Sequence, residues 1–307
     1  MPRKVLSAGA DCPLCSSCRA PTVGYEKSMG FIPWVGSKQR ISKYIRSLAP
    51  PHSIRVIPFA GSLGELWGWE CDGVEEIAGD IDWRIINLWK VCQSCQLVNQ
   101  LLEELLMCPC ARGEVLRAKA SCTRRHYLRI PDVELAKDLV VLARWSQSCN
   151  MLRFITMTIH MTCRMAGPIS GYINALARLG FIHKRLKNIQ LLCQDAFDTI
   201  RQFDSKDAFI YCDPPYIGTR EDTPYSNLEL QNQSQHEKLL SVLLKAQAKI
   251  MISSYPNNLY ESILGSAGWK KFSIKVPNNI IRSMGDAFQK NKYKTEVLWM
   301  NYEPVVP

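Results

Sequence analysis

The sequence predicts an α/β protein in which a mostly parallel sheet is interrupted along the chain by a mainly helical inserted domain. Short apolar runs rich in β-forming residues occur in the first and last thirds of the 307 residues. Several of these runs stop at an aspartate, as buried parallel strands do when they present a loop at their carboxyl ends. Between them, from Trp83 to about Lys187, apolar residues recur at helical spacing. Acids at several strand ends predict one ligand crevice along that edge of the sheet.

Composition argues against a membrane or secreted protein. The chain is 47% hydrophobic with a mean hydropathy of −0.12. No apolar run approaches the ~20 residues of a membrane span, and Met1–Tyr25 lacks the apolar core of a signal peptide. We therefore expect a cytoplasmic protein, and a monomer, because no dimer-forming helix is evident. Residues 1–28 lack periodicity and are expected to form an N-terminal extension that need not be ordered.

The 13 cysteines are scattered and odd in number. The tightest cluster, Cys12, Cys15 and Cys18, has no fourth ligand at a suitable spacing, and a Zn²⁺ site normally needs four. We expect free thiols and no metal.

Positive charge is concentrated in the middle of the chain. The net charge is +10, and the segment from Lys90 to Gln190 holds 15 Lys and Arg against 6 Asp and Glu. Ala111–Arg129 is predicted to be a basic loop, and its cations are Arg112, Arg117, Lys119, Arg124, Arg125 and Arg129. Such a loop is typical of a segment that binds the phosphate backbone of DNA. An ordinary solvated helical surface is the alternative.

The first segment with binding chemistry is Pro33–Lys38, before a helix patterned through Leu48. Gly36 lets the backbone approach a ligand closely, and Trp34 and Lys38 flank it near a helix start. This combination suits a carboxylate or a phosphate, with an ordinary helix entry as the alternative.

A strand over 53–57 and the turn after it predict a nucleotide fold. The turn, Pro58-Phe59-Ala60-Gly61, leads toward a helix beginning near Glu65, and a second strand over 76–79 ends at Asp80, about 20 residues after the turn. In such folds the glycine admits the ligand and the acid binds ribose hydroxyls. The turn is not G-x-G-x-x-G, so we expect a nucleoside site without phosphates.

The central strand, 208–212, ends at Asp213-Pro214-Pro215-Tyr216. The prolines cannot donate to a sheet and have a fixed φ, so they hold this loop rigid. A carboxylate and a carbonyl that accept both N–H bonds of an aromatic amine localise its lone pair. Asp213 and the Pro214 carbonyl can do so while Tyr216 stacks on a flipped base, which predicts methylation of an exocyclic amine. A Pro-Pro turn capped by Asp is the alternative.

Four further strands complete the predicted sheet. One covers 188–193 and ends at Gln194-Asp195-Ala196, and one covers 249–254 after a helix over 235–246. The last two are expected to form an antiparallel pair over 272–276 and 295–302.

In this order, the segments resemble the Dam-type DNA adenine-N6 methyltransferases over about residues 30–303. The resemblance implies a Rossmann-like, S-adenosylmethionine-dependent methyltransferase sheet, formed by 29–90 and 189–307, with a target-recognition domain over 91–188. It implies double-stranded DNA as the partner. Asp213, Pro214, Pro215 and Tyr216 would hold the target adenine. The methyl donor would be bound by Trp34, Gly36, Lys38, Pro58, Phe59, Ala60, Gly61, Asp80, Asp195 and Ala196.

Three alternatives stay open. The same loop handles any exocyclic amine, so cytosine-N4 methylation is one, although Asp rather than Ser at position 213 favours adenine. The segment His160–Gly167 lacks the aromatic residue and the Asn of the family's recognition stretch, which leaves a DNA-binding protein without activity as the second. Methylation of RNA or of a protein amide fits the loop, but a protein substrate explains the basic segment less well.

Overall fold

The computed structural model describes residues 30–70, 72–124, 130–146, 161–162, 165–217, 230, 232–277 and 293–304. The predicted N-terminal extension with its cysteine cluster lies outside these residues. So do Arg125, Arg129 and part of the His160–Gly167 segment.

A seven-stranded sheet with the order β5-β2-β1-β6-β7-β9-β8 forms the centre of the fold. The first five strands in this order are parallel, whereas β9 runs antiparallel to both of its neighbours. The strands are β1 (Ile54–Ile57), β2 (Glu75–Asp80), β5 (Ile189–Cys193), β6 (Ala208–Cys212), β7 (Lys249–Ser254), β8 (Lys270–Pro277) and β9 (Tyr293–Met300). The predicted α/β, Rossmann-like fold and the closing antiparallel pair are therefore confirmed.

Helices cover both faces of the sheet, which is why β6 is buried along its whole length. Phe209 and Tyr211 pack under α1 (Ser42–Leu48). The alternate residues Ile210 and Cys212 face the other layer, where α8 (Ala196–Gln202), α9 (Gln233–Leu243) and the short α10 (Asn258–Tyr260) supply apolar side chains.

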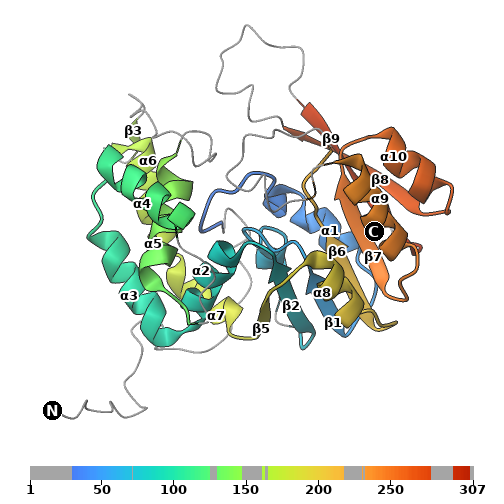
Figure 1. The fold of residues 1–307 in the computed structure, drawn as a ribbon, viewed down its shortest axis with the longest axis horizontal. Coiled ribbons are helices and arrows are strands. Elements are labelled where there is room, and N and C mark those ends of the chain that lie inside the picture. The colour runs from blue at the N-terminus through green and yellow to red at the C-terminus, as the bar shows by residue number, and fades with distance from the viewer. Residues whose placement is uncertain are drawn as a thin grey trace, which may run out of the picture.

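The inserted part is mainly helical, as predicted, and gathers beyond the β5 edge of the sheet (Figure 1). A two-stranded β3–β4 ribbon precedes α6. The elements are α2 (Trp83–Gln93), α3 (Cys95–Leu106), α4 (Arg112–Arg124), α5 (Val133–Trp145), β3 (Met161–Thr162), β4 (Met165–Ala166), α6 (Gly167–Leu176) and α7 (Leu179–Leu186).

Helix α2 runs without a break through the domain boundary expected at residue 90. One apolar cluster joins Ile57 and Ala78 of the sheet to Trp89 of α2 and Leu139 of α5. The sheet and the helical part therefore share one core, so the arrangement of the helices is tied to the sheet.

Two predicted elements were wrong. The basic loop over Ala111–Arg129 is largely helix α4, because Val115, Ala118 and Cys122 form a buried stripe at helical spacing between the charges. The helix expected near Glu65 is only a 3₁₀ turn, Leu66–Gly68.

The 3₁₀ turn ends close to α1, where Gly68 lies next to the Arg46 side chain. The backbone becomes extended at the next residue, Trp69, and turns toward β2.

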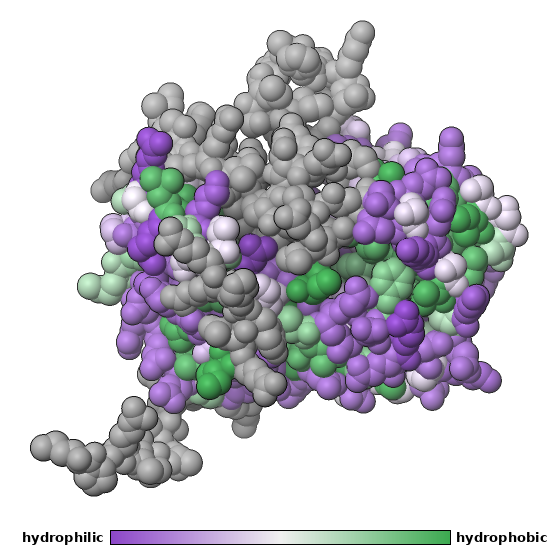
Figure 2. Space-filling view, in the orientation of Figure 1, coloured by the Kyte–Doolittle hydropathy of each residue, from purple (hydrophilic) through white to green (hydrophobic). Residues whose placement is uncertain are grey.

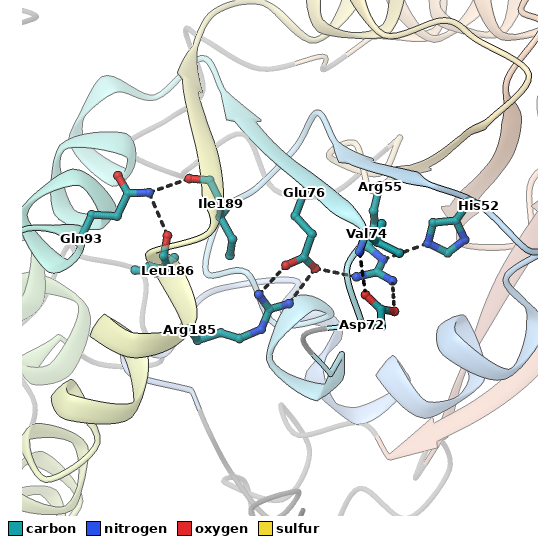
Figure 3. A network of polar contacts seen from close by, with 9 residues as sticks. All are labelled: His52, Arg55, Asp72, Val74, Glu76, Gln93, Arg185, Leu186 and Ile189. Carbon is teal, nitrogen blue, oxygen red and sulfur yellow. Dashed lines mark hydrogen bonds and ion pairs between the residues drawn. The ribbon is translucent and has the colours of Figure 1, made fainter. Parts of the chain in front are cut away.

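A buried network of charges ties α7 to the amino-terminal ends of β1 and β2 (Figure 3). Arg185 donates twice to the Glu76 carboxylate, and Arg55 Nη1 lies 2.5 Å from Glu76 Oε1. Arg55 also pairs with Asp72 at 3.0 Å. Arg55, Glu76 and Arg185 are buried but paired, which is the condition under which a folded protein tolerates buried charges, whereas Asp72 is exposed.

Hydrophilic and hydrophobic residues are interspersed over the described surface shown in Figure 2. Among the helices that the structure describes, none combines the length and apolar character needed to cross a bilayer.

Candidate active site

Four neighbouring parallel strands bring the predicted site residues to one edge of the sheet. The carboxyl ends of β5, β2, β1 and β6 lead to Asp195, Asp80, Gly61 and Asp213 respectively. The chain moves outward from β1 to β2 and β5, then returns to place β6 on the other side of β1. Such a switch in strand order opens a crevice between two loops, here those after β1 and β6.

Asp213 is held by two donors from other parts of the chain. Lys38 Nζ lies 2.8 Å from Asp213 Oδ1, and Ser253 Oγ donates to the same oxygen at 2.8 Å. The Lys38 and Asp213 side chains are only 5% and 16% exposed. Both contacts use Oδ1, and none of the described residues donates to Oδ2. A fixed carboxylate with one oxygen available suits an incoming amine.

Tyr216 is fixed at three points. Its hydroxyl donates to Glu296 Oε2 at 2.6 Å, and its ring meets the Tyr255 ring at a centroid distance of 4.5 Å and an interplanar angle of 73°. Lys38 Nζ lies 4.7 Å from the centre of the Tyr216 ring. The Asp-Pro-Pro-Tyr loop is therefore held by both an ion pair and a second aromatic ring.

Burial shifts the protonation of this cluster. Burial by itself lowers the pKa of Lys38, but the nearby Asp213 and Glu296 carboxylates outweigh it and the pKa is raised. Glu65, on the loop after β1, is buried and its Oε1 has no hydrogen-bond partner among the described residues. Burial, with a smaller contribution from Asp213, raises the pKa of Glu65 to about 8, so this side chain is largely neutral at pH 7.

The segment carrying Lys38 packs against the loop after β1. Gly61 has a φ of +43°, which favours glycine, and a Cβ there would stand 3.1 Å from Nε1 of Trp34. Ser62 Oγ donates to Ser37 Oγ at 3.1 Å. Lys38 Nζ also donates to the carbonyl of Gly36 at 2.6 Å. The Pro33–Lys38 segment and the loop after β1, which the sequence analysis identified separately, therefore pack against each other.

Asp80 has the chemistry of a diol-binding carboxylate. Its two oxygens accept one backbone N–H each, from Gly61 at 2.8 Å and from Asp82 at 2.9 Å. A carboxylate offers about four lone-pair sites, so acceptor capacity remains for two hydroxyls. Burial, and then the Asp82 carboxylate, raise the pKa of Asp80 to about 7.

The other residues predicted to bind the methyl donor also lie at the carboxyl ends of the parallel strands. Asp195 Oδ1 caps α8 by accepting from Phe197 N at 2.7 Å, and Ala196 is the buried first residue of that helix. Pro58 and Ala60 complete the turn after β1, in which Ala60 is buried and Phe59 packs partly buried against the α8–α9 side.

The predicted DNA-binding cations differ in their surroundings. Arg112 and Lys119 are exposed on α4. Arg117 instead pairs with Glu114 at 3.1 Å and with the buried Asp138 at 2.9 Å. The side chains of Arg124, Arg125 and Arg129 lie outside the described part of the structure.

Sequence reasoning did not identify Ser253, Glu65 and Glu296 as members of the site. Ser253 follows directly after the β7 residue that pairs with Cys212, so the strand register places it beside Asp213. Glu296 directly precedes the buried apolar end of β9, Val297–Met300. A polar residue that adjoins a buried apolar run is a pattern that could have indicated both Ser253 and Glu296.

Comparison with known proteins agrees with this geometry. The chain matches the family described as D12 class N6 adenine-specific DNA methyltransferase over residues 34–281, which is most of its length. A search of curated proteins found no match. Members of this family use S-adenosylmethionine as the methyl donor. The matched region contains the Lys38 segment, the loop after β1, Asp80 and the Asp-Pro-Pro-Tyr loop, and the chain therefore belongs to the D12 class of N6 adenine-specific DNA methyltransferases.

Proposed function

We propose that Asp213, Pro214 and Tyr216 hold the target adenine in this adenine-specific DNA methyltransferase, with Pro215 keeping the loop rigid. The observation that carries the proposal is the Asp213 carboxylate. Lys38 and Ser253 both contact its Oδ1, which leaves Oδ2 to accept an N–H bond from the target amine. The Pro214 carbonyl is the second acceptor, and the two together localise the nitrogen lone pair. Catalysis is then mainly positioning and hydrogen bonding.

S-Adenosylmethionine supplies an activated methyl group on a sulfonium. We propose that Asp80 accepts from its ribose hydroxyls, for which two acceptor sites remain on that carboxylate. Pro58, Phe59, Ala60 and Gly61 would form the wall beside it. Asp195 and Ala196, next along the edge, would meet its adenine. The segment of Trp34, Gly36 and Lys38 would shape the methionine end.

We propose that the helical segment 91–188 recognises double-stranded DNA and that the protein acts as a monomer. Arg112 and Lys119, both exposed on α4, would contact phosphates. Arg117 serves the fold instead, as the counter-ion of Asp138. Replacing Arg112 and Lys119 by glutamine should weaken DNA binding and reduce the salt dependence of the binding constant. Sedimentation of the purified protein measures its mass in solution and so tests whether it is a monomer.

The direct test of the reaction is methylation of unmethylated genomic DNA with isotopically labelled S-adenosylmethionine, followed by digestion and nucleoside analysis. We expect the label in N6-methyl-2′-deoxyadenosine. Label in N4-methyl-2′-deoxycytidine would contradict methylation of adenine. Salt-sensitive DNA binding without any label would indicate a DNA-binding protein without activity.

The test of the proposed role is Asp213→Ala. This variant should lose methylation but keep its affinity for the donor, measured by calorimetry. Asp207→Ala is the matched control, because Asp207 is an exposed residue just before the same strand. Normal turnover by Asp213→Ala would refute the mechanism.

A further inference from the structure

The Tyr216 hydroxyl and the Glu296 carboxylate form a buried bond between two distant parts of the chain. Tyr216 lies in the loop after β6 and Glu296 lies on β9, 80 residues later. The oxygens are 2.6 Å apart, and the two residues are 9% and 8% exposed. A short hydrogen bond to a buried carboxyl is among the stronger polar contacts in a protein.

The antiparallel register of β7 and β9 gives this bond a second point of support. Ser254, the last residue of β7, pairs with Val297, so Tyr255 directly after the strand is next to Glu296 in the antiparallel order. Tyr255 packs against the Tyr216 ring, and Lys294 Nζ lies 5.1 Å from the centre of the Tyr255 ring. A tyrosine side chain has two χ angles, so one contact at its hydroxyl and another at its ring fix the plane of the ring.

A simpler interpretation is that a buried tyrosine hydroxyl needs some acceptor, and Glu296 is that acceptor. A neutral acceptor would satisfy this need at a lower desolvation cost than a carboxyl group. The position of the bond, close to Asp213, favours a role in orienting the target base as well. Tyr216 follows directly after the two prolines that join it to Asp213, so a tilt of its ring changes the angle at which a stacked base presents its amine to that carboxylate.

We propose that Glu296 is a positioning residue for methyl transfer, which fixes the plane of the Tyr216 ring and thereby aligns the target amine with Asp213. This inference rests on the proposed role of Tyr216 in holding the target base. It assigns a positioning role in the reaction to the antiparallel strand β9, which lies outside the parallel part of the sheet that carries the other site residues.

The test is a double-mutant cycle of Glu296 with Tyr216. Glu296→Gln keeps a carbonyl acceptor and should stay within about 3-fold of wild-type kcat, because the hydrogen bond survives. Glu296→Leu removes it and should lower kcat about 10- to 100-fold, with the KM for the methyl donor little changed. In a Tyr216→Phe background, which already lacks the hydroxyl, Glu296→Leu should cost less than about 2-fold more.

Chemical unfolding of the wild type, Tyr216→Phe, Glu296→Leu and the double variant gives a readout that does not depend on activity. The stabilities of Tyr216→Phe and Glu296→Leu should be non-additive, because both substitutions remove the same bond. The inference is overturned if Glu296→Leu is equally harmful with and without the Tyr216 hydroxyl, or if the Gln and Leu variants lose equal activity. Failure of the underlying role of Tyr216 would differ, since Tyr216→Ala would then keep wild-type turnover.

Discussion

Replacing Lys38 by methionine should destabilise the protein by about 3 kcal/mol, because it leaves the Asp213 carboxylate without its counter-ion. The methionine keeps most of the length of the side chain and removes the charge. Breaking one side of a buried ion pair costs about 3–5 kcal/mol. We expect the lower end of this range, because Asp213 is 16% exposed and retains its bond from Ser253.

A double-mutant cycle separates the ion pair from other effects. Asp213→Asn leaves the Lys38 ammonium buried, at 5% exposure, and should also destabilise. The variant with both substitutions contains a neutral pair, so its loss should fall short of the sum of the single losses by about 1–2 kcal/mol.

Urea unfolding followed by circular dichroism measures all four stabilities. Lys43→Met is the matched control, since Lys43 is an exposed lysine on the neighbouring helix α1, and it should stay within about 0.5 kcal/mol of wild type. Strictly additive losses, or a Lys38→Met variant within about 1 kcal/mol of wild type, would refute the view that the charges depend on each other.

Three further outcomes are expected. Ser253→Ala should lower the methylation rate about tenfold by removing a donor to the Asp213 carboxylate, whereas Ser254→Ala, at a buried serine whose Oγ has no partner among the described residues, should change it little. Burial raises the pKa of Glu65 from 4.5 to about 8. As the pH rises between these values, the stability of the wild type should therefore fall relative to that of Glu65→Gln, by up to about 1.4 kcal/mol per pH unit. Parallel plots of stability against pH for the two proteins would contradict this. Glu76→Ala should destabilise by at least about 3 kcal/mol, because it leaves two buried arginines without their shared carboxylate, and the exposed Glu75→Ala is its control in the same unfolding assay.

The predicted strands were confirmed because their information is local. Most are short apolar runs that end at a residue unable to continue them, such as Pro214 after β6 or the turn after β1. Helix α4 was missed for the opposite reason. Its buried residues, Val115, Ala118 and Cys122, are few and small, and the charges between them dominate the composition of the segment.

The sequence by itself determined which residues stand at the carboxyl ends of the parallel strands, and from these acidic and proline-containing ends it predicted binding of an amine and a nucleoside. This follows because a strand and the loop after it are continuous in the chain. Only the tertiary structure decided what holds that edge in place. Ser253 is 40 residues from Asp213, and Glu296 is 80 residues from Tyr216. The order and register of the strands bring these side chains together, and neither property can be read from one segment at a time.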